Sequence, residues 1–258
     1  MKICNKMEIS DNLIQMNLKK LEEVINGGGL HESFHHLEIH GVRIDSKNIK
    51  EGNVFVPIIR VKDGHEYVKE SMDNGAVASL WKKSYGTPPK GVPIIFVDDT
   101  LFALQQLAQF YRREINVKVI GITGSNGKTT VKDIIEGILS STYRVHKTKG
   151  NFNSQIGLPL TILEMKRNTE FLILEMGMSE KGCRIIERFT WNSFRGNCPK
   201  VDVKNQNLFK NACILQSEEI EYSVNIKSDD QEKYMMQRST ESNRLLERLR
   251  YRMMERHL

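Results

Sequence analysis

The sequence has few of the features that mark secreted, membrane or zinc-binding proteins. Only four of its 258 residues are cysteine and no two are spaced as C-x-x-C, so neither a zinc knuckle nor a dense disulfide framework is indicated. The apolar runs are well short of the roughly 20 residues that cross a bilayer. Residues 1–8 lack the apolar core of a secretory signal. We therefore expect a cytoplasmic protein with no membrane span.

An excess of charge of one sign is also small. The formal net charge is +6, from 38 Lys and Arg against 32 Asp and Glu, and the two signs are interspersed. This pattern favours a solvated surface over nucleic-acid binding, so we predict no nucleic-acid partner. With 39% hydrophobic and 27% charged residues, the chain has ordinary globular composition and enough length for one large or two small domains.

Glycine is distributed unevenly, because 17 of the 18 glycines precede Cys183 while 9 of the 15 arginines follow it. In the glycine-containing part, turn residues separate apolar, β-branched runs that alternate with helical stretches. This alternation predicts an α/β fold with parallel strands. The runs that we interpret as strands are 54–57, 76–81, 93–97, 117–123 and 171–175.

Two helices are predicted in the first part of the chain. One follows apolar residues over 13–25 and ends at the glycines 27–29, where we expect a left-handed C-terminal cap. The other covers 101–111, with Asp98 and Asp99 as its expected N-terminal caps. We place a domain boundary shortly after it, near residue 115. Beyond the boundary, strands alternate with loops and helices as in the beginning of a parallel sheet, and three strands rarely complete one.

The strongest chemical signal is the segment Gly121-Ile-Thr-Gly-Ser-Asn-Gly-Lys-Thr-Thr130, between a β-branched strand and the helix 131–139. Such a loop directs backbone N–H groups and a helix N-terminus at phosphate oxygens. Its spacing differs from G-x-x-x-x-G-K-[ST], because Ile122 occupies the first glycine position. We predict ATP as the ligand, with Lys128 as the catalytic contact to the β and γ phosphates and Thr129 on Mg²⁺. The predicted ATP-binding residues are Gly124, Ser125, Asn126, Gly127, Lys128, Thr129 and Thr130.

A nucleotide site also needs a carboxylate for the metal, and the carboxyl end of a neighbouring parallel strand is where one is expected. Glu175 follows the apolar run 171–174 and precedes Met176-Gly177. We therefore predict that Glu175 is the second metal ligand, with an ordinary surface glutamate as the alternative.

From about Met16 to Gly182 the sequence resembles the Mur ligase family, most closely its MurF type. The central marks are the loop 121–130, the segment Lys147-Thr-Lys-Gly-Asn-Phe-Asn-Ser-Gln-Ile-Gly-Leu-Pro-Leu-Thr161 and the segment 174–182. The amino-terminal part adds similar segments at 41–47, 52–57, 63–65 and 74–78.

The resemblance implies an ATP-dependent amide ligase of peptidoglycan synthesis that uses Mg²⁺ and joins D-alanyl-D-alanine to a UDP-N-acetylmuramoyl-tripeptide through an acyl phosphate. It places Ser46 beside the uridine nucleotide, and Asn151 and Asn153 on the muramoyl-peptide side of the cleft. The implied domains are a small α/β UDP-sugar-binding domain at 1–115 and an incomplete parallel-sheet ATP-binding domain at 116–182. Residues 183–258 form an unassigned, irregular or helical tail.

The tail lacks the motifs that should follow Gly182, so we hypothesise that residues 183–258 are out-of-frame or rearranged sequence on a truncated ligase. A noncatalytic nucleotide-binding remnant is then the alternative function, and a ligase like folylpolyglutamate synthetase is a weaker one. Two smaller alternatives also stay open. A basic amphipathic helix over 239–256 is either an exposed helix or a membrane or partner contact. The cluster His31, His35, His36 and His40 is expected to be a solvated loop rather than a metal site.

Overall fold

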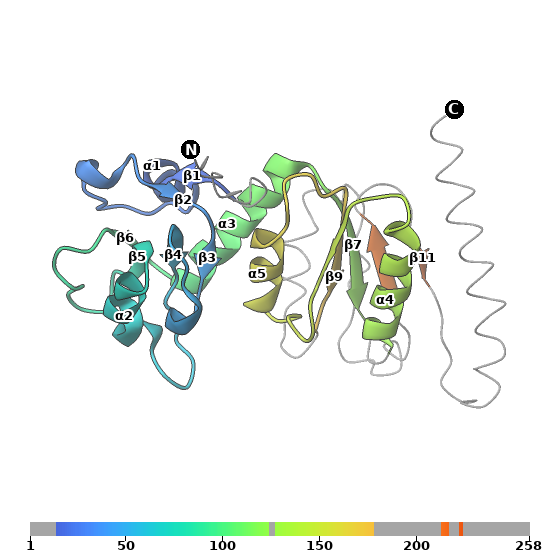
Figure 1. The fold of residues 1–258 in the computed structure, drawn as a ribbon. Helices are drawn as coiled ribbons and strands as arrows, with labels where there is room; N and C mark the ends of the chain where they lie inside the picture. Colours follow the sequence, from blue (N-terminus) through green and yellow to red (C-terminus); the bar gives the residue numbers. More distant parts are fainter. Residues whose placement is uncertain (1–13, 124–126, 178–212, 217–221, 224–258) are drawn as a thin grey trace, which may run out of the picture.

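The computed structural model describes residues 14–123, 127–177, 213–216 and 222–223, which form two sheets with helices between and around them (Figure 1). The first sheet has the order β3-β4-β5-β6 with all strands parallel. Its strands are β3 (Val42–Arg43), β4 (Asn53–Phe55), β5 (Ala76–Lys82) and β6 (Ile94–Val97). A separate antiparallel pair joins β1 (Met16–Asn17) to β2 (Glu38–Ile39).

Helices of this first half are short apart from one. They are α1 (Leu18–Val24), α2 (Val68–Asp73) and α3 (Thr100–Ile115), with 3-10 turns η1 (Glu32–Phe34), η2 (Ser46–Asn48) and η3 (Gly64–Tyr67). Asp99 caps α3 as predicted, since its carboxylate accepts a hydrogen bond from the Phe102 backbone N–H at 2.7 Å. Asp98 does not cap the helix but pairs with Lys83 at 3.0 Å.

The end of α1 differs from the sequence prediction of a glycine cap. The left-handed residue is Asn26, with φ 50°, and the N–H groups of Asn26 and Gly27 bond back to the carbonyls of Glu23 and Glu22. Asparagine tolerates this conformation because its short polar side chain bonds locally. Gly27 is needed for space instead, because a Cβ there would lie 2.5 Å from the Ile95 side chain.

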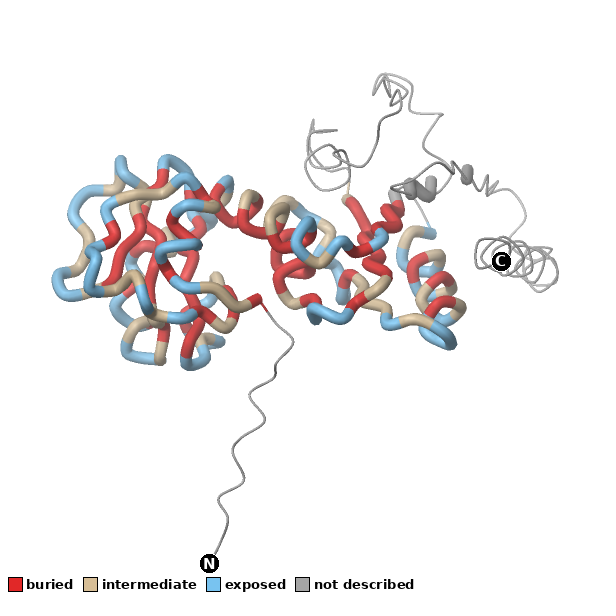
Figure 2. The backbone as a smooth tube through the Cα atoms, turned by 90° about the horizontal axis from the view of Figure 1, so that it is seen from above, coloured by how far each residue is buried: buried red, intermediate tan, exposed pale blue. Residues whose placement is uncertain are grey.

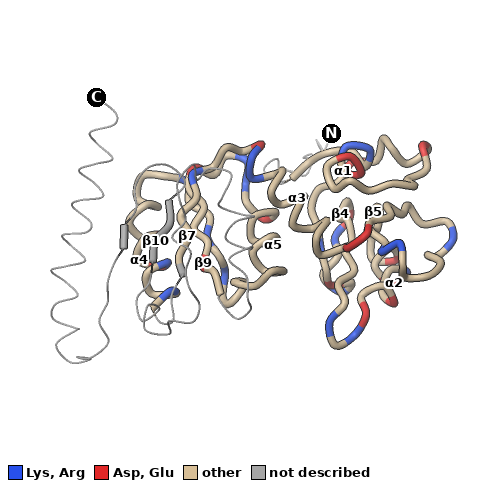
Figure 3. The backbone as a smooth tube through the Cα atoms, turned by 180° about the vertical axis from the view of Figure 1, so that it is seen from behind, with Lys and Arg blue, Asp and Glu red and all other residues tan. Residues whose placement is uncertain are grey.

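The second sheet has the order β11-β10-β7-β9-β8. Strands β7 (Lys118–Thr123), β9 (Phe171–Glu175) and β8 (Val145–Lys147) run parallel, and helices α4 (Lys128–Leu139) and α5 (Gly157–Leu163) connect them. This order of strands, loops and helices is the one that the sequence predicts. The two remaining strands, β10 (Cys213–Gln216) and β11 (Tyr222–Ser223), come from the tail, and β10 lies antiparallel along β7. Figure 3 shows β7 and β9 between α4 and α5.

The tail was expected to be irregular or helical, and its described residues are these two strands. The amphipathic helix predicted over 239–256 lies outside the described residues. Within the residues that the structure does describe, no helix has both the length and the apolar character needed to cross a bilayer.

Successive side chains of the central strands point to opposite faces of the second sheet. Ile120, Ile122 and Ile173 pack with Ile135 and Leu139 of α4 on one face. The alternate side chains, such as Val119 and Leu172, belong to a larger core that also contains α5, α3, α1 and one face of the first sheet. The buried segments therefore continue from one sheet to the other (Figure 2).

Helix α3 lies between the two sheets and contacts both halves of the chain. Its Tyr111 is 1% exposed, and the Tyr111 hydroxyl donates to the Met165 carbonyl, beyond α5, at 2.7 Å. The Gln105 side-chain amide donates to the Gln155 carbonyl at 3.2 Å. One helix therefore holds the first sheet at a fixed distance from the loop that leads into α5.

Candidate nucleotide and metal site

The predicted phosphate loop lies between the end of β7 and the start of α4, and its residues 124–126 are outside the described residues. Gly127 is the N-cap of α4 with φ 77°, a left-handed conformation that glycine adopts without steric cost. Its carbonyl accepts the first helical bond, from Val131 N–H at 2.9 Å. Lys128, Thr129 and Thr130 thus form the first turn of α4, at the positive end of the helix dipole.

Glu175 occupies the last position of β9, and its side chain is 5% exposed. In the parallel pairing of β9 with β7, Glu175 lies opposite Ile122, so both strands end at the same edge. The Glu175 backbone N–H donates to the Thr148 hydroxyl at 3.0 Å, which fixes the strand end next to β8.

Side chains from α4 and from the loop before α5 contact the Glu175 carboxylate at the end of β9. The Thr129 hydroxyl donates to Oε2 at 3.0 Å, and the Asn153 amide lies 3.4 Å from Oε1. Lys132 Nζ lies 3.4 Å from Oε2. The structure thus brings together the two predicted metal ligands and one of the two predicted substrate asparagines.

Lys132 is the member of this cluster that sequence reasoning missed. It lies one helical turn after Lys128, and its side chain is only 4% exposed. Buried lysines are rare unless they are paired, so its position beside Glu175 is a specific feature. The available signal was the four-residue spacing from Lys128, which places both lysines on the same side of α4.

The other predicted substrate residues lie apart from the Glu175 carboxylate. Asn151 is exposed, and its carbonyl accepts the Asn153 N–H at 2.7 Å. Ser46 belongs to η2 beside the first sheet, is 5% exposed, and donates its hydroxyl to Glu70 at 3.0 Å. The Asn153 loop is fixed at both ends, because Gly177 N–H donates to the Asn153 carbonyl and Gly157 lies close against Phe152.

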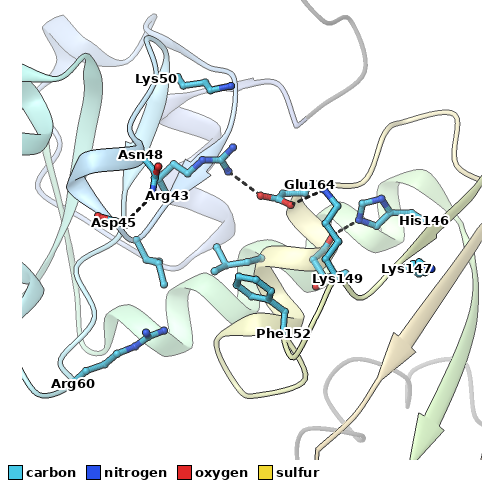
Figure 4. A pocket seen from close by; sticks show the side chains of 13 residues that line it. Arg43, Asp45, Asn48, Lys50, Arg60, His146, Lys147, Lys149, Phe152 and Glu164 are labelled. Carbon is cyan, nitrogen blue, oxygen red and sulfur yellow. Dashed lines mark hydrogen bonds and ion pairs between the residues drawn. The ribbon is translucent and has the colours of Figure 1, made fainter. Parts of the chain in front are cut away.

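A pocket of about 490 Å³ lies between the first sheet and the α5 region (Figure 4). One wall comes from η2, β3 and the loops beside them, and the other from β8, the loop that follows it and α5. Five Lys and Arg side chains line it against two carboxylates, so its charge is positive. The charged lining residues are Arg43, Lys50, Arg60, Lys147, Lys149, Asp45 and Glu164.

Two ion pairs meet at Glu164 in this pocket, and the pair with Arg43 joins its two walls. Arg43 of β3 lies 3.3 Å from Glu164, which follows α5, and Lys149 lies 3.7 Å from the other oxygen of the same carboxylate. Both contacts are drawn in Figure 4. Because these side chains are partly exposed, each pair contributes little to stability. Their main effect is to position side chains, since Glu164 holds two cations at the pocket wall.

Lys147 connects the pocket to the helix of the phosphate loop. Its ammonium donates to Glu136 at 2.8 Å and to Asp133 at 2.9 Å, both on α4. The bonds to Glu136 and Asp133 raise the pKa of Lys147, and the bond from Lys147 lowers the pKa of Asp133. Lys147 therefore stays charged and links β8 to α4.

His146 also lines the pocket and is held neutral. Burial lowers its pKa, although its Nε2 lies 2.9 Å from the Thr161 carbonyl, which favours the protonated ring. The neutral tautomer with a proton on Nε2 satisfies that carbonyl.

Part of the chain is similar to known proteins. The profile described as "Mur ligase middle domain" matches residues 122–192, which include the end of β7, α4, the Asn153 loop and Glu175. The chain is also 47% identical over 171 residues to the UDP-N-acetylmuramoyl-tripeptide–D-alanyl-D-alanine ligase of Bacillus subtilis. Residues 122–192 of this chain thus match the middle domain of the Mur ligases. The profile match extends ten residues beyond Gly182, where we predicted that the resemblance would end.

Further proteins that this chain is similar to are of the MurF type. The ligase of the same name from Treponema pallidum is 40% identical over 152 residues, covering 55% of this chain and 33% of its own. A crystal structure of MurF from Acinetobacter baumannii has a TM-score of 0.60 and 28% sequence identity, covering 66% of this chain and 38% of that one. The B. subtilis alignment covers 66% of this chain, which thus spans about 37% of the length of that relative.

The remaining candidate site in this chain was the histidine cluster. His31 bonds Ser33 at 2.8 Å, and His35 Nε2 lies 3.3 Å from the Leu30 carbonyl. His40 is separate from them, next to Gly52 in the first sheet region. Among the described residues, no three His, Cys, Asp or Glu side chains are grouped to hold a metal ion.

Proposed function

We propose that this chain is part of an ATP-dependent amide ligase that adds D-alanyl-D-alanine to UDP-N-acetylmuramoyl-tripeptide in the cytoplasm. The chain spans about 37% of the length of its B. subtilis relative. The activity of the whole ligase is therefore proposed for this chain and does not follow from the similarity alone. The observation that carries it is the 3.0 Å contact between Thr129, in the first turn after the glycine loop, and Glu175, at the end of the adjacent strand.

ATP would bind with its phosphates at the N-terminus of α4. Gly127 leaves the backbone there open, since no atom of the described residues, apart from its own chain neighbours and the backbone of α4, lies within 4 Å of where its Cβ would be. Lys128 would neutralise the β and γ phosphates, and Thr130 and the predicted loop residues 124–126 would complete the phosphate contacts.

The oxygen donors beside Lys128 fit Mg²⁺. A hydroxyl and a carboxylate are the hard ligands that this ion prefers, and it takes its remaining ligands from phosphates and water. Thr129 and Glu175 would hold it. When bound, Mg²⁺ supplies charge stabilisation on the transferred phosphoryl group. The arrangement of one protein carboxylate and one hydroxyl matches an ion that is shared with a nucleotide.

The positive pocket would take the anionic substrate. Five cations against two carboxylates suit a diphosphate and a peptide with free carboxylates. Ser46 follows Asp45 of one pocket wall in the sequence, and Asn151 and Asn153 flank Phe152 of the other. We propose residues 1–115 as the sugar-nucleotide domain and 116–182 as part of the ATP domain. Residues 183–258 are left without a role.

The proposed reaction has two steps. The peptide carboxylate attacks the γ phosphorus, and ADP leaves as the acyl phosphate forms. The amine of D-alanyl-D-alanine then attacks the acyl carbon through a tetrahedral intermediate, loses a proton and expels inorganic phosphate. Lys128 and the N–H groups at the start of α4 stabilise the negative charge of the first step.

Calorimetric titration of ATP, with and without Mg²⁺, tests the nucleotide site directly. We expect Lys128→Ala to weaken binding at least tenfold. Lys118→Ala, which removes the same charge from the other, exposed end of β7, should bind as the unmodified chain does. Equal binding by Lys128→Ala would refute the site.

Product formation tests the activity. Mass spectrometry should detect the ligated nucleotide only with ATP, the tripeptide nucleotide and D-alanyl-D-alanine together, and not with Lys128→Ala. ATP binding without any product would instead support the noncatalytic remnant.

A further inference from the structure

Lys132 places an ammonium group inside the site that we propose for the metal. Its side chain and that of Glu175 are 4% and 5% exposed, and Nζ lies 3.4 Å from Oε2. The second carboxylate within reach is Asp133, with Oδ1 3.9 Å from Nζ and a side chain that is 53% exposed. Glu175 is therefore the buried partner of this ammonium.

Two neutral side chains also contact Glu175. Thr129 donates to the same oxygen as Lys132, and Asn153 approaches the other. A buried carboxylate without a cation would be strongly destabilising, so Lys132 supplies the compensating charge. A divalent cation on Oε2 would compete with Lys132 for the same oxygen and would repel it.

The net charge of the site then determines when a divalent metal ion can bind. Glu175 and Lys132 together are neutral, and adding a divalent ion alone would leave two uncompensated positive charges in a buried site, next to Lys128. ATP phosphates carry enough negative charge to offset the ion and both lysines.

We propose that Lys132 is a positioning residue that holds the Glu175 carboxylate in the nucleotide-free protein and weakens metal binding until nucleotide arrives. Metal and nucleotide therefore bind together, with Lys132 coupling them. This inference rests on the proposed function, because it takes Glu175 as the metal ligand. A merely structural Lys132 would stabilise the fold without affecting the order in which the two ligands bind.

The test measures Mn²⁺ binding to the full chain by the loss of the free-ion signal in electron paramagnetic resonance, with and without ADP. The unmodified chain should bind Mn²⁺ at least tenfold more tightly with ADP than the free protein does, after correction for Mn²⁺ bound to free ADP. Lys132→Gln keeps a hydrogen-bond donor but removes the charge. It should bind Mn²⁺ alone about tenfold more tightly than the unmodified chain and show less enhancement by ADP.

The matched control is Lys83→Gln, which removes one positive charge from an exposed pair with Asp98. It should behave as the unmodified chain. If circular dichroism shows that Lys132→Gln is unfolded, Lys132→Met provides the same loss of charge with an apolar stem. Independently of any variant, equal Mn²⁺ affinity with and without ADP in the unmodified chain would overturn the inference.

Glu175→Gln separates this inference from the proposed function. If it leaves Mn²⁺ binding in the presence of ADP unchanged, the proposed metal site is wrong. If it abolishes that binding while Lys132→Gln does not tighten binding of the free ion, the metal site is supported and only the role of Lys132 is refuted.

Discussion

The Tyr111 hydroxyl is predicted to stabilise the junction between the two sheets. It is buried on α3 and donates to the Met165 carbonyl at 2.7 Å. Tyr111→Phe keeps the ring and removes the donor. A buried hydrogen bond contributes about 1 kcal/mol net, and leaving the carbonyl unsatisfied adds to the cost, so we expect a loss of roughly 1–2 kcal/mol. For a protein of this size, each kcal/mol corresponds to about 2–4 °C in Tm.

This loss should depend on pH in a defined direction. Burial raises the pKa of Tyr111 from 10.0 to about 12. Above pH 10 the unfolded chain releases the phenol proton while the folded chain retains it, so the stability that Tyr111 provides is complete below pH 10 and falls as the pH rises toward 12. Between pH 8 and pH 11 the advantage over Tyr111→Phe should fall by about 1.4 kcal/mol, which brings the two proteins close to equal stability.

Urea unfolding at pH 8 and pH 11, followed by circular dichroism, measures both quantities. The control is Tyr143→Phe, because the Tyr143 ring contacts Phe171 and its hydroxyl makes no hydrogen bond within the described residues. The control should change stability by less than about 0.5 kcal/mol. A Tyr111→Phe protein as stable as the unmodified chain at pH 8, or a difference that does not change with pH, would refute the argument.

Three further predictions concern individual positions. Asp99→Ala removes the cap of α3 and should cost about 1 kcal/mol in urea unfolding, whereas Asp98→Ala should be close to neutral. Gly157→Ala would bring a Cβ within 2.5 Å of the Phe152 backbone and should both lower Tm by several degrees and weaken ATP-dependent Mn²⁺ binding, as calorimetry would show. Burial lowers the pKa of His146, so the unfolded chain binds more protons below about pH 6.5; stability should fall there, and His146→Gln should reduce that fall.

The longer parallel strands were predictable because they are continuous runs of β-branched and apolar residues. The β-branched and apolar runs at 76–81, 117–123 and 171–175 match β5, β7 and β9 within a residue or so. By contrast, β3 has only two residues, which is too short for an alternating pattern to be recognised. The prediction for the end of α1 was wrong because the sequence pattern assigned the left-handed residue to the neighbouring glycines. Asparagine also adopts this conformation, and Asn26 does so here.

The site was predictable where it depends on sheet topology and not where it depends on tertiary contact. Thr129 and Glu175 are 46 residues apart, yet parallel strands bring both to one edge of the sheet. Arg43 and Glu164 are 121 residues apart, and the contact between β3 and the end of α5 is one that no local pattern predicts. The burial of Lys132 is likewise set by the elements packed around it.

The short loop between β8 and α5 connects the two candidate sites. Lys149 and Phe152 line the pocket, and the next residue, Asn153, approaches Glu175 at 3.4 Å. A ligand in the pocket and a nucleotide at α4 would therefore contact adjacent residues of one segment. Because Gly157 and Gly177 hold that segment in place, it would position the two ligands relative to each other, as the phosphoryl transfer that we propose requires.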